Sequence, residues 1–240
     1  MSIASELNRL LQAKSDLATS IENKGVTVPS ATTIDGYAAL VDQIQQGTPL
    51  PYDAEVTYLE STGTQFINSG VNATATLTTE IKFSLVSGFT LGNTSFLFGI
   101  YNDSPSRYSV AIPSLSSLRV GTSTGFTNVT CPTMSYGVAN TLSYKFGSIK
   151  FNSSQIGTTS GVINTTMSIY LFGRHNANTT GEVTNKIRIY GATFTDNNNI
   201  IIRDLIPVRV GQVGYMYDRI SGALFGNAGT GNFTLGPDVT

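Results

Sequence analysis

The sequence has few of the residues that build catalytic and metal centres. Its 240 residues include one cysteine, one histidine and no tryptophan. A single cysteine, Cys131, excludes an intrachain disulfide and a cysteine cage for a metal ion. We therefore expect Cys131 to be a small buried or half-buried residue, and we expect neither a metal ion nor a cofactor.

Charge is also scarce. Charged residues make up 12% of the chain, against roughly 25% in an average globular protein. The basic residues form no stripe that could neutralise phosphates and no patch that would attract anionic lipid. We expect neither nucleic acid nor a membrane as a partner.

Long apolar runs are missing as well. The longest is far below the roughly 20 residues that span a bilayer. The first residues have neither the basic region nor the apolar region of a signal peptide. The sequence thus predicts a chain made in a cytoplasm, where it stays or from which it leaves by lysis.

Paired carboxylates are the chemistry of glycosidases, which hold two of them about 5–9 Å apart. In the larger part of this chain the acids are scattered singly, as at Glu80, Asp103, Glu182 and Asp196. We expect no catalytic residues and no enzyme activity. Hydrolysis by carboxylates that pair across strands stays open as the third-ranked alternative.

Residues 1–47 carry a helical pattern. Six positions follow a 4-3-4-3-4 spacing over nearly three heptads, which is the a/d seam of a short coiled coil. These predicted oligomerisation residues are Ile3, Leu7, Leu10, Lys14, Leu17 and Ile21. The polar Lys14 at an a position would set register or oligomer state. An ordinary amphipathic helix that docks on its own domain is the alternative.

A second, shorter helix is predicted from about Thr33, after Gly25 ends the first. Two short helices in 47 residues bury too little apolar surface to be stable alone. Residues 1–47 are therefore expected to be an oligomerisation or attachment module. Residues 48–53 form a linker stiffened by prolines, and residues 54–240 form a separate domain.

The periodicity changes to two after the linker. Many short segments alternate in polarity and end at Gly, Asn, Asp or Pro, as β-strands do. One of these segments places Ile81, Phe83 and Leu85 on the same face, and another does so with Ile187 and Ile189. A dozen such strands without intervening helices predict a mainly β domain with two stacked antiparallel sheets.

Two stretches resemble a known kind of domain. The first is Tyr58-Leu-Glu-Ser-Thr-Gly-Thr-Gln-Phe-Ile-Asn-Ser-Gly-Val71. The second runs from Lys186-Ile-Arg-Ile-Tyr through Tyr215-Met-Tyr-Asp-Arg219 to Leu224-Phe-Gly-Asn-Ala-Gly-Thr-Gly-Asn-Phe233. They are similar to the opening and closing segments of concanavalin A-like (laminin-G-like) domains in virion appendage proteins of gut bacteriophages, including the crAss-like group. The resemblance implies a two-sheet jelly-roll β-sandwich.

The same resemblance implies a function. The chain would be a structural component of a phage particle, made in the cytoplasm of the host bacterium. It would form an oligomeric head fibre or capsid decoration, with a trimer preferred. The helical start, with Lys24-Gly-Val-Thr-Val-Pro29 and Tyr37-Ala-Ala-Leu, is similar to a module at the N-termini of phage virion proteins, which implies contact with other virion proteins through residues 1–47. Its sandwich would face outward, where it could bind host or mucosal glycans. A tail-associated receptor-binding or carbohydrate-binding protein is the alternative.

Two segments combine aromatic rings with hydrogen-bond donors, as sugar-binding sites do. With no tryptophan in the chain, Tyr or Phe would have to stack on the sugar. The candidate glycan-binding residues are Tyr101, Asn102, Asp103, Arg107 and Tyr108 in one segment, and Arg174, His175 and Asn176 in the other. The alternative is that both segments are plain connections between strands.

Two further segments allow a simple interpretation. Asp196-Asn-Asn-Asn199 offers oxygen atoms to calcium, but between two strands it favours a hairpin turn. The glycines of Phe225-Gly-Asn-Ala-Gly-Thr-Gly231 lack the strand–helix frame and the lysine of a phosphate loop. We expect them to form turns.

Overall fold

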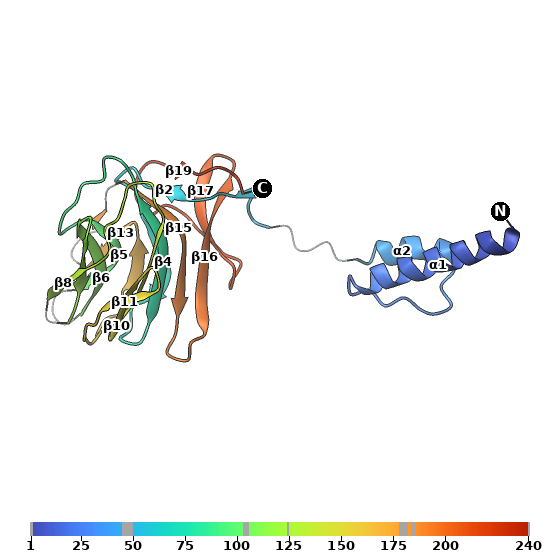
Figure 1. The fold of residues 1–240 in the computed structure, drawn as a ribbon, viewed down its shortest axis with the longest axis horizontal. Coiled ribbons are helices and arrows are strands. Elements are labelled where there is room, and N and C mark those ends of the chain that lie inside the picture. Colours follow the sequence, from blue (N-terminus) through green and yellow to red (C-terminus); the bar gives the residue numbers. More distant parts are fainter. Residues whose placement is uncertain are drawn as a thin grey trace. The chain divides into compact units, whose positions relative to one another are not determined.

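The computed structural model describes residues 2–44, 50–102, 106–123, 125–177, 182–183 (backbone only) and 186–239. The chain divides into two compact units, Met1–Leu50 and Pro51–Thr240 (Figure 1). This division lies inside the 48–53 segment that the sequence suggested as the linker.

The first unit is a helical hairpin. Helix α1 (Ile3–Glu22) begins at Ser2, whose hydroxyl accepts a hydrogen bond from the Ser5 amide at 3.2 Å. It is followed by Gly25, whose φ of +83° suits the left-handed conformation that commonly ends a helix. The return segment holds a short 3₁₀ helix, η1 (Ile34–Gly36), and helix α2 (Tyr37–Val41). The second helical segment thus begins at Ile34, close to the expected Thr33, and consists of these two short pieces.

Within the described residues, no helix is both long enough and apolar enough to cross a membrane.

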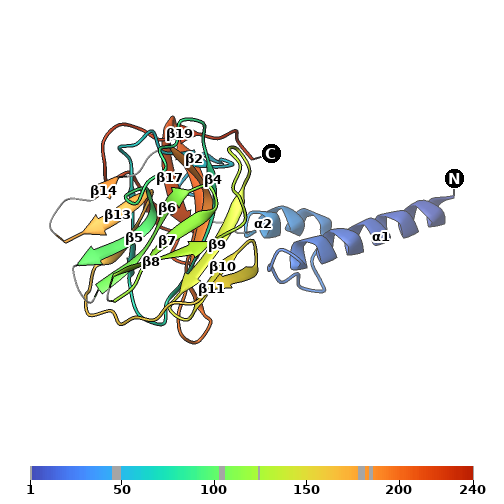
Figure 2. The ribbon, with the colours of Figure 1, turned by 60° about the vertical axis from the view of Figure 1, so that its left-hand side comes forward.

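The second unit is built from two sheets, which Figures 1 and 2 show as separate layers, with β5, β6 and β8 in one and β4, β15 and β16 in the other. Within the described residues the larger sheet has eleven strands, and its main path runs β11-β10-β9-β4-β15-β16-β17-β18. Its strands are β1 (Ala54–Glu55), β2 (Leu59–Glu60), β4 (Thr78–Leu85), β9 (Asn140–Lys145), β10 (Ser148–Phe151), β11 (Ser154–Gly157), β15 (Ile187–Thr195), β16 (Ile201–Val210), β17 (Val213–Asp218), β18 (Leu224–Phe225) and β19 (Thr234–Leu235).

The smaller sheet has eight described strands, along the path β14-β13-β5-β6-β7-β8, with β12 joining β3 to β5. Its strands are β3 (Ile67–Asn72), β5 (Phe96–Asn102), β6 (Ser106–Ser114), β7 (Ser117–Gly121), β8 (Phe126–Thr130), β12 (Ser168–Leu171), β13 (Gly173–Asn176) and β14 (Glu182–Val183). All its described pairings are antiparallel except that of β13 with β5.

The core lies between the inner faces of the two sheets. Ile81, Phe83 and Leu85 of β4 are fully buried, and so are Ile187 and Ile189 of β15. The strand phase predicted from the sequence is therefore confirmed. Together with the two antiparallel sheets, it supports the expected mainly β, sandwich-like domain.

Several strands differ from the expectation. The pieces Lys186–Tyr190 and Ala192–Phe194 belong to one continuous strand, β15, with a register shift between Ile189 and Gly191. Strands β8, β11 and β13 were not anticipated at all. Cys131 is buried, as expected.

The two stretches that carry the resemblance lie against each other. The Ala228 and Thr230 amides donate to the carbonyl oxygens of Phe66 and Thr64, at 2.9 and 3.0 Å. The Asn227 side-chain oxygen accepts from the Phe66 amide at 3.2 Å. The glycine-rich segment 225–231 is thus a turn that fastens the end of the domain to its beginning, as the turn interpretation expected.

Candidate binding and assembly sites

The structure brings the two candidate glycan-binding segments together. Strand β13 pairs with β5, with His175 opposite Ile100 and Asn176 opposite Tyr101. The Ala177 amide extends this ladder by donating to the Tyr101 carbonyl oxygen at 3.0 Å. Figure 2 shows β13 alongside β5 in the smaller sheet. Residues about 75 positions apart in sequence therefore contribute to one surface.

Arginine side chains and aromatic rings alternate along this part of the sheet, where Phe96 and Arg174 are buried and Tyr101, Arg107, Arg119 and Phe126 are half-exposed. The guanidinium carbon of Arg174 lies 4.1 Å from the ring centre of Phe96 and 4.3 Å from that of Tyr101. The guanidinium carbon of Arg107 lies 5.2 Å from the ring centre of Tyr101 and 5.8 Å from that of Phe126. In such cation–π contacts the negative face of the aromatic ring attracts the cationic guanidinium.

The row continues to β7. Arg119 lies 3.9 Å from the ring centre of Phe126, and the Tyr101 and Phe126 rings are nearly parallel, at 6.4 Å and 11°. We call this set the guanidinium–ring array, and its members are Phe96, Tyr101, Arg107, Arg119, Phe126 and Arg174. It crosses β13, β5, β6, β7 and β8.

Strand alternation places the array on the outer face of the smaller sheet. Tyr108, Val110 and Ile112 of β6 belong to the core. Successive side chains of a strand point to opposite faces, so Arg107 and Ser109 point away from the core. A line of small residues crosses the sheet beside the array. Gly99 is opposite Ser109, and a Cβ atom on Gly121 would lie 3.0 Å from the Ser109 hydroxyl oxygen. The small residues leave room for large side chains to lie across the strands.

Tyr108 is a correction to the candidate list. It is fully buried, and its hydroxyl lies 2.8 Å from the Tyr144 carbonyl oxygen and 3.0 Å from that of Leu77. Burial raises the pKa of this phenol far above its usual value. Tyr108 therefore holds the core together and cannot contact a ligand. Asp103, another candidate, lies outside the described residues.

The remaining candidates are held by their neighbours. His175 stacks on Tyr170 at 4.1 Å and 4°, and its Nδ1 lies 2.9 Å from the Ser168 carbonyl oxygen. Asn102 is half-exposed and its amide nitrogen donates to the Thr165 hydroxyl at 3.4 Å. Asn176 is largely buried. His175 thus lies in a strand, rather than in the loop that the sequence suggested.

Sequence reasoning missed three members of the array, Phe96, Arg119 and Phe126. A signal existed for Arg119, because it alternates with Leu118 and Val120, which are both core residues. Phe126 gave little signal, since its segment Phe126-Thr-Asn-Val-Thr130 has only two apolar residues.

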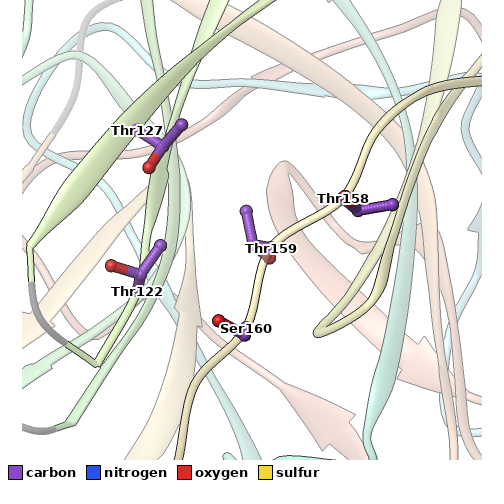
Figure 3. A pocket seen from close by; sticks show the side chains of 5 residues that line it. All are labelled: Thr122, Thr127, Thr158, Thr159 and Ser160. Atoms are coloured by element: carbon purple, nitrogen blue, oxygen red, sulfur yellow. The ribbon is translucent and has the colours of Figure 1, made fainter.

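A polar pocket lies at the β7–β8 hairpin that carries Phe126. Its volume is about 360 Å³, and hydroxyl side chains line it: Thr122, Thr127, Thr158, Thr159 and Ser160. In Figure 3, Thr122 and Thr127 stand on the hairpin side and the other three on the facing segment. The lining has no charged group, so its chemistry suits a neutral hydroxylated ligand or water.

Carboxylates provide no metal cage in the described residues, where no group of three or more His, Cys, Asp or Glu side chains could hold an ion. Asp196 instead closes a hairpin turn, since its Oδ1 accepts from the Asn198 and Ile200 amides at 2.8 and 2.9 Å.

One closely spaced acid pair was overlooked in the sequence, Asp53 and Glu55. Asp53 accepts from the Gly211 amide at 2.7 Å, and Glu55 from the Tyr52 hydroxyl at 3.2 Å. Both carboxylates have hydrogen-bonding partners in the domain.

The helical unit exposes most of its predicted seam. Ile3, Leu7, Leu10 and Leu17 are 92%, 55%, 47% and 42% exposed. Leu10, Leu17, Ile34 and Tyr37 are among the residues that line an apolar groove of about 150 Å³. Ile21 is a correction, because it is 2% exposed inside its own unit and is not available to another chain. Lys14 is half-exposed, and its carbonyl oxygen accepts from the Tyr37 hydroxyl at 3.4 Å.

In comparisons with known proteins, no protein-family model matches the chain and no curated protein matches it.

Proposed function

We propose that this chain is an assembled display protein without catalytic activity, in which the helical unit associates with copies of itself and the sandwich binds a ligand. The exposed leucine seam of α1 carries the proposal. Ile3, Leu7, Leu10 and Leu17 repeat at coiled-coil spacing on one 20-residue helix and remain accessible.

The unit has little else to stabilise it. Within the described part of residues 1–44, only Ile21 and Tyr37 are buried apolar residues. An isolated helix of this length is marginal in water, and most helices gain their stability from packing of an apolar face. Packing the seam against further copies would bury it, and the resemblance to phage fibres makes a trimer the expected state.

Light scattering tests the assembly. The full chain is expected to be a trimer and residues 51–240 a monomer. Leu10→Ala with Leu17→Ala should weaken the trimer, because both side chains lie on the seam. Leu11→Ala is the matched control, since Leu11 is similarly exposed but off the seam. A monomeric full chain at micromolar concentration would contradict self-assembly.

We further propose that the assembly belongs to a bacteriophage particle, as a head fibre or capsid decoration, and that the sandwich has the concanavalin A-like jelly-roll connectivity. The support is the resemblance of residues 58–71 and 186–233 to virion appendage domains. A tail-associated receptor-binding protein is the alternative. Mass analysis of purified virions tests the first point, and cryo-electron microscopy of the particle distinguishes head from tail.

Saccharide binding by the sandwich is the second part of the proposal, supported by the guanidinium–ring array. Aromatic rings offer flat faces to the apolar side of a sugar, and guanidinium groups offer donors to its oxygens. A glycan array probed with the oligomer tests it, and Tyr101→Ala should reduce binding. Glu80→Ala, a change to an exposed residue of the other sheet, is the control. Binding that is unchanged by Tyr101→Ala would exclude this surface.

A further inference from the structure

We propose that the ligand of the guanidinium–ring array is an anionic saccharide, one that carries uronate, sialate or sulfate groups; this inference rests on the proposed saccharide binding. The carrying observation is a separation of charge between the two sheets, together with the way the arginines of each sheet are partnered.

The acids of the sandwich gather on the larger sheet. Every acidic residue of the sandwich whose side chain the structure describes lies in a strand or turn of that sheet. These are Asp53, Glu55, Glu60, Glu80, Asp196, Asp204, Asp218 and Asp238. The other two acids, Asp103 and Glu182, lie where side chains are not described. The described side chains of the smaller sheet are thus basic or neutral.

The arginines follow the same division. Those of the larger sheet all have a carboxylate partner at 2.7–2.8 Å: Arg188 with Glu60, Arg203 with Asp218, Arg209 with Asp238, and Arg219 with Asp204. Arg107 and Arg119 of the smaller sheet are partnered instead by rings and by carbonyl oxygens. Arg107 donates to Ser123 at 3.3 Å and Arg119 to Asn93 at 2.8 Å.

A carbonyl oxygen leaves a guanidinium charge unneutralised. A guanidinium has five donors in a planar fork, and the Ser123 carbonyl oxygen accepts from Nη1 of Arg107. Arg174 does not belong to this group, because it stands opposite Glu182 in the β13–β14 ladder. Among the residues that the structure describes, Arg107 and Arg119 have no carboxylate partner, and both are half-exposed, so an anion can approach their positive charge.

The neighbouring features favour a sugar as the carrier of the anion. The parallel rings of Tyr101 and Phe126 flank Arg107, so a sugar face can stack while its acid group meets a guanidinium. Nucleic acid would also present anions, but it favours a continuous basic stripe, and this surface offers two separated arginines.

The test uses two matched pairs of immobilised polymers with the full chain. Dextran sulfate is compared with dextran, and polygalacturonate with its methyl ester. The acidic member of at least one pair should bind more tightly, and a rise in NaCl should weaken it, because salt screens exposed charges. The two pairs distinguish sulfate from carboxylate, and a single-stranded DNA oligonucleotide is a third probe.

The variants localise the binding. Arg107→Gln with Arg119→Gln should weaken it by roughly 10- to 100-fold, the usual range for loss of hydrogen bonds to a charged group. Arg119→Gln alone keeps the test valid if the double variant unfolds. Lys145→Gln with Lys150→Gln removes equal charge from exposed positions of the larger sheet, and it should change binding by less than about 2-fold.

Each outcome decides a separate point. Equal binding to the acidic and neutral members of both pairs, with sensitivity to Tyr101→Ala, would overturn the anionic class and keep saccharide binding. Equal losses in the arginine and lysine variants would also overturn it, as a general charge effect. Tighter binding of the oligonucleotide would reassign the surface to nucleic acid. No binding to any saccharide, there or on the glycan array, would remove the proposed saccharide binding itself.

Discussion

At the scale of single residues, Gly99 allows strands β5 and β6 of the smaller sheet to approach each other closely. Its φ is +142°, and a Cβ atom there would lie 2.2 Å from the Ser109 Cβ and 2.4 Å from backbone atoms of β6. Only glycine fits a strand that approaches its neighbour so closely. The array depends on this approach, because Tyr101 follows two residues later.

Gly99→Ala is expected to destabilise the sandwich by about 3 kcal/mol or more, because backbone strain and overlap combine. Gly211→Ala is the control, since Gly211 also has positive φ but has no neighbour within 4 Å of the added atom; its cost should be about 1 kcal/mol. Urea denaturation of residues 51–240 measures both. Similar costs would show that the β5–β6 approach can relax.

Cys131 should react slowly while the domain is folded. Burial raises the pKa of its thiol to about 11, from the ordinary 9.0. At pH 8 this leaves about a hundredfold less thiolate, the reactive form, than an ordinary cysteine has. Thiol titration with a disulfide reagent, native and in guanidinium, measures the ratio of rates. The native rate should rise with pH, and a native rate within a few-fold of the unfolded one would contradict the burial.

Tyr108 and Phe126 mark what could be read from single residues. Tyr108 shares its phase with Val110 and Ile112, so alternation alone could have placed it in the core. The hairpin-loop interpretation of residues 101–108 obscured this pattern. Phe126 had no such pattern, because its partners in the array come from other strands and meet it only in the folded domain.

At the scale of elements, the inner faces of β4 and β15 carry the core. Phe83→Ala is expected to cost about 3–5 kcal/mol, because it leaves a cavity between packed sheets. Glu80→Ala in the same strand faces solvent and should cost less than about 0.5 kcal/mol. Chemical denaturation of residues 51–240 compares them. Equal costs would mean that the buried and exposed faces of β4 are exchanged.

The β16–β17 ladder has a polar centre at Asp218. Its carboxylate accepts hydrogen bonds from Arg203 and the Asp204 amide at 2.8 Å and from the Ser221 hydroxyl. Burial by itself would raise its pKa, but the hydrogen bonds from Ser221 and from the amides of Asp204, Ile220 and Ser221 outweigh burial, and the pKa lies below the ordinary 3.8.

Asp218→Asn should therefore cost about 3 kcal/mol at pH 7, because the buried bonds to a charged acceptor are weakened. A carboxylate whose pKa is lowered by folding stabilises above its unfolded pKa, and the benefit disappears as pH falls through the folded value. The difference between wild type and variant should shrink below pH 3.8 and stay constant above it. A difference independent of pH would mean that the charge of Asp218 contributes nothing.

Strands with alternating apolar residues were predictable, and strands with few apolar residues were not. In strand β4, Ile81, Phe83 and Leu85 point into the core, and the exposed Glu80 and Lys82 alternate with them. Strand β8 pairs only with β7 among the described strands, and β13 has the sequence Gly-Arg-His-Asn without an apolar residue. Their pairing comes from backbone hydrogen bonds, which leave no period in the sequence.

At the scale of the whole molecule, assembly and binding should reinforce each other. A trimer carries three sandwiches, and linking weak sites can raise apparent affinity by about 10²–10⁴-fold when they bind together. The full chain is thus expected to bind a dense dextran sulfate surface far more tightly than residues 51–240, with equal affinity for a short soluble fragment. Surface plasmon resonance compares them, and equal affinities on the dense surface would separate binding from assembly.

The division of the chain into two units was readable from its sequence, because the period changes from helical to alternating near Pro51. The array was not readable as a site. Its members lie in five strands between Phe96 and Arg174, and only the crossing of β13 beside β5 brings the two segments into contact.

The first and last segments of the sandwich run next to each other. The Thr57 amide donates to the Pro237 carbonyl oxygen, and the Gly236 and Val239 amides donate back to Tyr58 and Glu55, all at 2.9 Å. A short peptide could join these two neighbours and let the polypeptide be opened elsewhere, for instance at the Asp196–Asn199 turn. Such a circularly permuted sandwich would be attached to its carrier protein at this hairpin turn, instead of at the present ends of the domain. The attachment point of the domain can therefore be moved, and a designer could choose which of its surfaces points away from the support.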